Sequence, residues 1–155
     1  MAPLMDLIAG DRREIVIAFA VEDWASLSDT ERFPAHLSLG GGLDPTWLDL
    51  FSEAARSVTG LREPVDFLDA RDELADSRAT DRLLERVDPA WVAAVAAIPH
   101  AHLDAIAGTW IDLVEAEMGA LGADEKPWIR SLTEDLVTFS RRATGARDVI
   151  FAWSL

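Results

Sequence analysis

Two segments of the chain share one helix-initiation pattern, and this pattern constrains the fold more than any other feature. Residues 43–48 (LDPTWL) and 87–92 (VDPAWV) each place an aspartate before a proline, with an apolar residue on either side. An aspartate at the N-cap accepts a hydrogen bond from a free amide of the first turn, and proline suits the first helical position because no amide hydrogen is needed there. The pattern predicts helices that begin at Pro45 and Pro89.

Apolar residues at helical spacing follow both starts and continue in two later segments. Gly60 offers an end for the first helix, and Pro99 separates the second helix from a third. A fourth helix is expected from about residue 124, closed by Gly145. The stripes predict one core that contains Trp47, Phe51, Trp91, Trp110, Leu132, Leu136 and Phe139.

Strand-like patterns mark other segments of the chain. Apolar residues alternate in residues 148–155 (DVIFAWSL), so this segment is expected to enter a sheet. Residues 35–39 are expected to be extended. Residues 80–87 fit either a neighbouring strand or a short helix. Residues 11–23 combine a capping-box spacing with strand-like alternation, and helix is favoured over strand.

These elements predict an α+β fold, a helix-rich single domain of residues 1–155 around a small β-sheet that includes the C-terminal strand. A chain of 155 residues is long enough to bury most of its surface around one core. Residues 61–79 are charged and poor in apolar side chains. We expect a surface excursion there rather than a boundary between domains.

The composition excludes several classes of binding partner and of site chemistry. Its 28 acidic residues against 14 lysines and arginines give a formal net charge of −14, which repels nucleic-acid phosphates and anionic lipids. We therefore expect no direct nucleic-acid binding and no membrane association. The absence of cysteine excludes disulfides, thiolate metal sites and a cysteine nucleophile. Arginine and alanine usage indicates a bacterial source, and the lack of a secretory signal in residues 1–13 predicts a cytoplasmic location.

The acidic residues are unevenly distributed along the chain. No lysine or arginine lies between Arg86 and Lys126, whereas this stretch holds seven aspartates and glutamates. Asp112 and Glu115 are three residues apart and share a face of the expected helix, with Glu117 at its border. One acidic face is therefore expected, and these three residues are the candidates for binding a basic protein partner.

A second candidate site lies around His36. A histidine can donate or accept a proton near neutral pH, but no spacing in the sequence selects a carboxylate as its partner. Trp24 lies among acidic residues rather than on an apolar stripe, which indicates a pocket rim or an interface. Ser38 lacks the Gly-x-Ser-x-Gly pattern of a hydrolase nucleophile. His36 and Trp24 are binding candidates, and no catalytic residue is assigned.

Neither a metal nor a cofactor is expected. On a helix, His100 and His102 point to different faces, so only His100 and Asp104 could share a metal ion, which leaves too few ligands. The glycines at 40–42 precede a helix, but they lack the lysine of a P-loop and the spacing of a dinucleotide-binding turn. They are expected to form a tight turn.

Three parts of the sequence carry a family resemblance: residues 43–51 (LDPTWLDLF) with 58–60 (VTG), residues 87–95 (VDPAWVAAV) and residues 149–155 (VIFAWSL). In these helix starts and the closing strand the chain resembles the uncharacterised bacterial YfbM-like family of small α+β proteins. The resemblance implies the same α+β fold. It implies no activity, cofactor or site residue.

The function expected from the sequence is that of a non-enzymatic protein-interaction module. The alternatives are a small enzyme or ligand-binding protein with a pocket near His36, and an acidic mimic of nucleic acid. A pocket that joins His36 to a carboxylate would favour the second class, and a flat acidic patch would favour the first. The sequence leaves the oligomeric state open.

Overall fold

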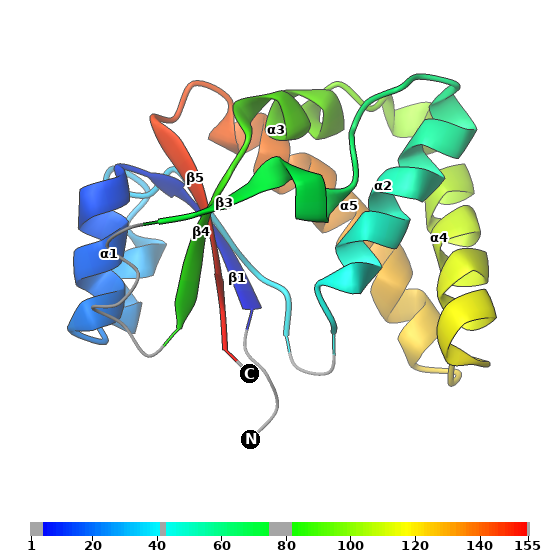
Figure 1. Ribbon diagram of the computed structural model, residues 1–155, viewed down its shortest axis with the longest axis horizontal. Coiled ribbons are helices and arrows are strands. Elements are labelled where there is room, and N and C mark those ends of the chain that lie inside the picture. Colours follow the sequence, from blue (N-terminus) through cyan, green and yellow to red (C-terminus); the bar gives the residue numbers. More distant parts are fainter. Residues whose placement is uncertain (1–4, 41–42, 75–81, 155) are drawn as a thin grey trace.

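An antiparallel sheet of five strands lies at the centre of the described structure, with helices on both faces (Figure 1). The computed structural model describes residues 5–40, 43–74 and 82–154. The strand order is β2-β1-β5-β4-β3. The bounds are β1 Met5–Gly10, β2 Ala35–Ser38, β3 Arg71–Glu73, β4 Leu83–Val87 and β5 Asp148–Trp153. This architecture confirms the predicted α+β fold and the C-terminal strand.

The helices divide unequally between the two faces of the sheet (Figure 1). One face carries α1 (Arg12–Ala20) and the short 3₁₀ helix η1 (Trp24–Ser28). The other carries α2 (Thr46–Thr59), α3 (Pro89–Ala96), α4 (Leu103–Met118) and α5 (Glu125–Ala143). The sheet therefore separates a large apolar core under four helices from a smaller core under α1. Within the described residues, no single helix is long and apolar enough to cross a membrane.

The inner strand β1, between β2 and β5, was not among the predicted elements. All six of its residues are buried, with Leu7 and Ala9 in the large core and Ile8 in the smaller one. A strand buried on both faces does not alternate between apolar and polar residues, so it lacks the usual strand pattern. Asp6 also interrupts its apolar run.

Both predicted helix starts are confirmed. The Asp88 carboxylate accepts a hydrogen bond of 2.9 Å from the amide two residues later, and α3 begins at Pro89. The Asp44 carboxylate accepts one of 2.8 Å from the amide of Thr46, where α2 begins, one residue later than expected. Gly60 follows α2 with a φ of 72°, a left-handed conformation that glycine adopts at little cost.

Residues 11–23 and 80–87, which the sequence allows to be either helix or strand, differ in the structure. Residues 12–20 form the favoured helix, α1, and the carboxylate of its N-cap Asp11 accepts a hydrogen bond of 2.8 Å from the Arg13 amide. Residues 83–87 form a strand, β4, which pairs with β5 as the expected neighbour. Residues 80 and 81 lie outside the described part of the chain.

The prediction of a surface excursion at residues 61–79 is wrong. Phe67 begins the 3₁₀ helix η2 (Phe67–Ala70) and is fully buried. Its ring centroid lies 4.8 Å from that of Trp91 and 5.1 Å from that of Phe151, edge-on in both cases. β3 then forms an edge of the sheet. A single aromatic residue anchors a segment of mostly polar composition, and residues 75–79 lie outside the described part.

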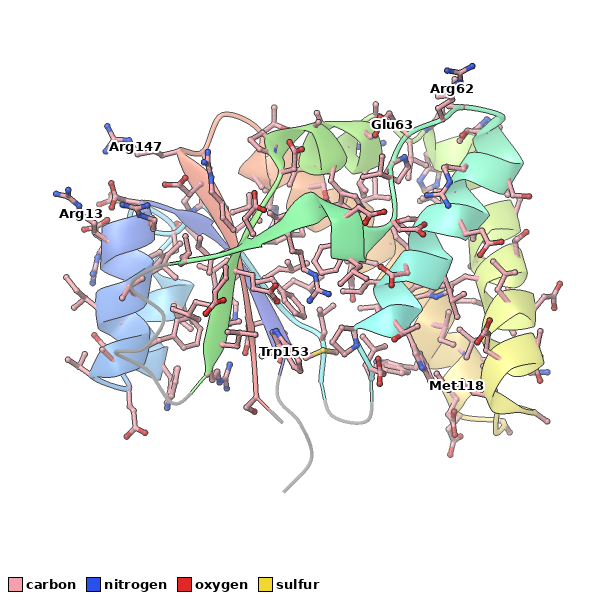
Figure 2. All side chains as sticks on the ribbon, viewed as in Figure 1. Arg13, Arg62, Glu63, Met118, Arg147 and Trp153 are labelled. Atoms are coloured by element: carbon pink, nitrogen blue, oxygen red, sulfur yellow. The ribbon has the colours of Figure 1, made fainter. Side chains whose placement is uncertain are left out.

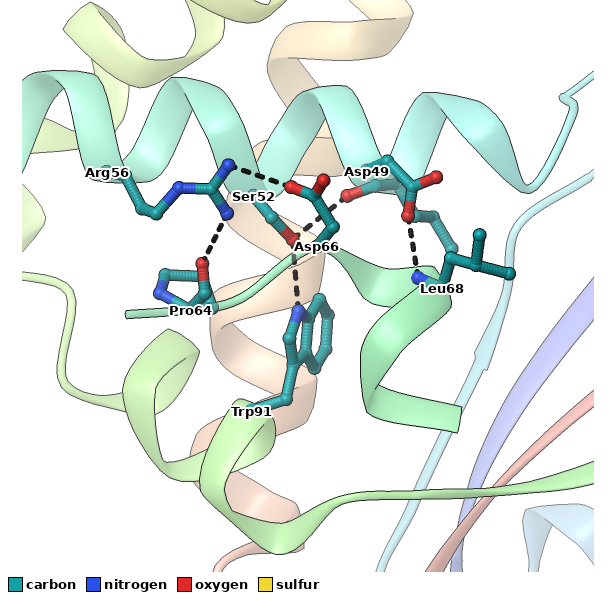
Figure 3. Close-up of polar contacts among 8 residues, drawn as sticks. Asp49, Ser52, Arg56, Pro64, Asp66, Leu68 and Trp91 are labelled. Carbon is teal, nitrogen blue, oxygen red and sulfur yellow. Dashed lines mark hydrogen bonds and ion pairs between the residues drawn. The ribbon is translucent and has the colours of Figure 1, made fainter. Parts of the chain in front are cut away.

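Polar contacts from α2 hold the same segment against the helix (Figure 3). The Arg56 guanidinium donates hydrogen bonds of 2.8 Å to the Pro64 carbonyl and 2.7 Å to the Asp66 carboxylate. About two turns earlier on α2, the Asp49 carboxylate accepts a hydrogen bond of 2.7 Å from the Leu68 amide. These contacts satisfy backbone groups of an irregular segment that makes few ladder hydrogen bonds of its own.

The predicted core residues are all buried. The indole N–H groups of the central tryptophans are also satisfied. Trp91 donates a hydrogen bond of 3.0 Å to the Ser52 hydroxyl (Figure 3), and Trp110 donates one of 2.8 Å to the Trp47 carbonyl. The Trp110 ring centroid lies 5.1 Å from that of Phe51. Trp110 therefore joins α4 to α2 through both an apolar contact and a hydrogen bond.

We expect Trp110→Ala to lower the free energy of unfolding by about 3–5 kcal/mol, because it leaves a cavity in the core and removes the hydrogen bond to the Trp47 carbonyl. Denaturant unfolding followed by circular dichroism measures the change. Met118→Ala is the matched control, because Met118 lies on the same helix with 51% of its surface exposed. A Trp110→Ala variant as stable as this control would show that Trp110 contributes little to the core.

Candidate functional site

A buried carboxylate lies on an inner strand of the sheet. Asp6 belongs to β1, is 7% exposed, and stands opposite Ser38 on β2 and Ala152 on β5. Its neighbour along the same face is Ile8, which packs in the smaller core beneath α1. The Asp6 side chain therefore lies on the α1 side of the sheet, where an ionised group needs polar partners to offset its desolvation.

His36 and Arg82 supply those partners. Asp6 Oδ1 lies 2.8 Å from His36 Nε2, and Asp6 Oδ2 accepts a hydrogen bond from Arg82 Nη1. Burial alone would raise the pKa of Asp6, but the hydrogen bonds from His36 and Arg82 outweigh it and hold the pKa below its usual range. Strand β2, strand β1 and the residue that precedes β4 thus meet at one carboxylate.

Aromatic rings cover the guanidinium of Arg82. Its central carbon lies 5.3 Å from the ring centroid of Phe19 on α1 and 5.1 Å from that of Trp24 on η1. The two rings contact each other edge-on at 5.2 Å. Trp24 is 45% exposed, so it forms the outer limit of the cluster. His36 and Trp24, which the sequence marks separately, therefore belong to one contiguous group through Asp6 and Arg82.

This group can orient an imidazole for proton exchange. Asp6 accepts the hydrogen bond at Nε2 and so fixes the His36 ring, while Nδ1 has no hydrogen-bond partner among the described residues. In the part of the chain that the structure describes, no hydrogen bond joins the Ser38 hydroxyl to His36. The arrangement therefore leaves one ring nitrogen of His36 without a partner among the described residues, and it provides no activated hydroxyl there.

The hollow beside His36 is not where its imidazole points. It has a volume of about 140 Å³ and lies between β2 and α5, lined by Asp135, Thr138 and Arg142 among others. The imidazole is bonded to Asp6 on the opposite, α1 side of the sheet. Burial, with the neighbouring Glu134 carboxylate, raises the pKa of Asp135 in this hollow.

A second charged cluster lies on the other face of the sheet. The Arg71 side chain, 6% exposed, donates a hydrogen bond of 3.0 Å to Glu85 and stacks on Phe67 and Phe151 at 5.0 and 5.2 Å. The Trp153 indole donates a hydrogen bond of 2.8 Å to the same glutamate. This pair joins η2, β3, β4 and β5. Arg71 Nη1 and the Trp153 indole both bind Glu85, while Arg71 Nε is buried without a hydrogen-bond partner among the described residues.

The three predicted acidic residues lie on α4, in the layer farthest from α1 (Figure 1). Asp112 and Glu117 are exposed, and no polar partner is recorded for either in the described residues. Glu115 is half-buried. Its carboxylate accepts a hydrogen bond of 3.1 Å from the Leu121 amide and lies 3.7 Å from the Lys126 ammonium. Glu115 thus stabilises the turn between α4 and α5.

The remaining candidates do not gather into a site. His100 and His102 belong to the short 3₁₀ helix η4 (His100–His102), which precedes α4. Among the described residues, no three histidine, aspartate or glutamate side chains lie close enough to hold a metal ion. Gly40 has a φ of 75°, as a tight turn requires, and residues 41 and 42 lie outside the described part.

Comparison with known proteins adds no functional assignment. No protein family, curated protein or solved structure matches this chain. The resemblance to the YfbM-like family therefore stays a prediction.

Sequence reasoning missed Asp6 and Arg82. A single aspartate inside an otherwise apolar run, residues 4–9 (LMDLIA), is the signal that could have revealed a buried charge. Nothing in the sequence around Arg82 marks it as the partner, because 76 residues separate it from Asp6.

We expect Asp6→Asn to lower the free energy of unfolding at pH 7 by about 2 kcal/mol, since it removes the charged acceptor of two hydrogen bonds. A lowered pKa in the folded state contributes stability that is present above the unfolded-state value of about 3.9 and lost as the pH falls through the folded-state value. The stability gap between wild type and Asp6→Asn should therefore narrow below about pH 4. Urea unfolding between pH 3 and 7 measures this gap.

The exposed Asp72→Asn variant, on the edge strand β3, is the control for this measurement. It removes one carboxylate without a recorded partner, so it should change stability by no more than about 0.5 kcal/mol throughout. A gap for Asp6→Asn that is independent of pH would mean that Asp6 is not ionised in the folded protein.

Proposed function

We propose that this chain is a non-enzymatic interaction protein of the bacterial cytoplasm that binds a basic surface of a partner protein through the outer face of α4. The observation that supports the proposal is the composition of this helix. α4 carries four carboxylates, on Asp104, Asp112, Glu115 and Glu117, and contains no lysine or arginine. A uniformly acidic helix face attracts basic surfaces and rejects acidic ones.

The spacing of the acidic residues along α4 places three of the four carboxylates on one side of the helix. Asp104 and Asp112 are two steps of four residues apart, and Glu115 follows Asp112 by three, so they share one side of α4. The opposite side packs in the core through Ile106, Trp110 and other apolar residues. The acidic residues therefore sit on a rigid element. A rigid surface loses less conformational entropy on binding than a loop would.

Some of the basic residues lie far from α4. Figure 2 shows Arg13 and Arg147 together at the end of the molecule near α1, while Met118 marks the end of α4 on the opposite side. The net charge of −14 attracts a basic partner over long range, and the carboxylates of α4 offer it an acidic surface at close range. Met118, 51% exposed, offers an adaptable apolar contact next to Glu117.

Ligand binding at His36 is the second candidate function, since its Nε2 is bonded to the Asp6 carboxylate and its Nδ1 has no hydrogen-bond partner among the described residues. A thermal-shift screen of small polar molecules separates the two candidates. A ligand of the His36 site should lose its effect in His36→Asn. It should keep its effect in a variant altered only on α4.

We expect the double reversal Asp112→Lys, Glu117→Lys to weaken partner binding about tenfold or more, because two attractive charges become repulsive. The partner is captured from a lysate of the source organism, identified by mass spectrometry, purified, and titrated by calorimetry at low and high salt. Binding to the wild type should weaken as salt rises, because exposed charges are screened over ~8 Å at physiological ionic strength. Glu115 is left unchanged because it stabilises the turn after α4.

The control is Glu31→Lys, Asp72→Lys, which makes the same change in net charge away from α4, at exposed residues after η1 and on β3. This variant should bind within about twofold of the wild type, and both variants should unfold normally. Equal weakening by the two variants, or binding that is insensitive to salt, would contradict a specific role of α4.

A further inference from the structure

We propose that two adjoining hollows, where α1, α3 and the turn between α5 and β5 meet, bind a small amphipathic anion. The ligand class is a molecule with an apolar body of about one ring and a phosphate or carboxylate group. This site lies apart from the acidic face of α4 and does not depend on the function proposed for that face.

The first hollow is apolar. It has a volume of about 210 Å³ and is lined by Val87, Pro89, Val92 and Ala93 on one side and by residues 143–149 on the other. Gly145, with a φ of 88°, turns the chain between α5 and β5. An apolar hollow of this size accommodates an aromatic ring or a short aliphatic group.

The second hollow is rich in arginine. It has a volume of about 360 Å³ and is lined by Asp11, Arg12, Arg13, Arg147 and Asp148. Arg147 and Asp148 line both hollows, so the two lie next to each other. Figure 2 shows Arg13 and Arg147 projecting from the same end of the molecule. A ligand seated in the apolar hollow would therefore place a polar group among these arginines.

The two aspartates of the second hollow are already engaged. The Asp11 carboxylate accepts hydrogen bonds from Arg147, at 2.9 Å, and from the Arg13 amide, at 2.8 Å. Asp148 forms an ion pair with Arg86 at 3.2 Å and accepts a hydrogen bond of 3.3 Å from the Arg12 amide. The first amides of α1 are thus satisfied by protein carboxylates. Anion binding here would depend on side chains rather than on the helix terminus.

The guanidinium groups of Arg12 and Arg13 remain available. Both side chains are exposed, and neither has a hydrogen bond or ion pair recorded among the described residues. Counting Arg86 and Arg147, four arginines face two aspartates in this region, in a chain with a net charge of −14. A local excess of positive charge against this background favours an anion, and guanidinium groups bind phosphate and carboxylate oxygens in pairs.

The two halves together specify the ligand. Inorganic phosphate would use the arginines and leave the apolar hollow empty, and a neutral aromatic molecule would do the reverse. A molecule that carries both groups binds through both hollows. Phenyl phosphate and phenylacetate are suitable probes, because they share a ring and differ in the anion.

Calorimetric titration and ligand-observed NMR test the proposal on the full chain with four probes: phenyl phosphate, phenylacetate, inorganic phosphate and phenol. We expect one or both amphipathic probes to bind with a Kd of about 1 mM or tighter, and inorganic phosphate and phenol to bind at least about tenfold more weakly. A preference between the two amphipathic probes identifies the anion. Failure of both to bind, or equal binding of inorganic phosphate, would overturn the proposal.

Two variants locate the binding. Arg12→Gln, Arg13→Gln removes the available guanidinium groups, and Ala93→Leu fills the apolar hollow from an exposed position on α3. Each should weaken binding about tenfold without loss of the unfolding transition. The control Arg62→Gln, Arg130→Gln changes the net charge equally at exposed arginines outside the site and should leave the Kd unchanged. Binding that survives both site variants, or falls equally in the control, would contradict this location.

Discussion

The antiparallel pairing of β1 with β5 is the contact on which the rest of the structure depends. It joins the first and last described elements of the chain over six residue pairs, from Met5 opposite Trp153 to Gly10 opposite Asp148. Alternate residues of both strands face the large core beneath four helices, and the others face the smaller core beneath α1. Because this pair closes a loop of more than a hundred residues, neither core is complete until both ends of the chain have met.

Asp6 makes this pairing specific as well as stable. In the observed register its side chain meets His36 and Arg82 on the α1 face. A shift of β1 by one residue would turn Asp6 toward the large apolar core and Leu7 away from it. A carboxylate buried there would have no counterpart for its charge, since its observed partners lie on the other face. We infer that the Asp6 cluster excludes the shifted register, which a wholly apolar strand would tolerate more readily.

Local signals in the sequence predicted most of the helices and the closing strand. The Asp-Pro pairs at 44–45 and 88–89, the stripe around Trp110 and the alternation after Asp148 each report a structure that a short segment specifies by itself. β1 and the segment around Phe67 depend instead on contacts with distant residues. Neither could be predicted from its own residues, because β1 lacks apolar–polar alternation and the segment around Phe67 is mostly polar. The same distinction applies to the sites. The charges of Asp112 and Glu115 could be placed on one helix face from spacing alone, whereas the Asp6–Arg82 contact exists only once the sheet has formed.

The acidic face of α4 and the arginine-rich hollow lie at opposite ends of the molecule, and α5 runs from the first region toward the second. The first turn of α5 brings Lys126 to within 3.7 Å of Glu115 on α4, and its last residue, Ala143, lines the apolar hollow next to the arginine-rich one. A helix layer is about 8–10 Å thick, so the layers between the two regions exceed the ~8 Å over which exposed charges interact at physiological salt. Occupying one region therefore does not alter the electrostatic potential at the other.

Any coupling between the two regions has to pass mechanically along α5. This helix packs in the core along its whole buried face through Ile129, Leu132, Leu136 and Phe139. A helix held that firmly does not shift in response to a small ligand without disturbing the large core. The structure thus favours two independent binding surfaces on one rigid scaffold.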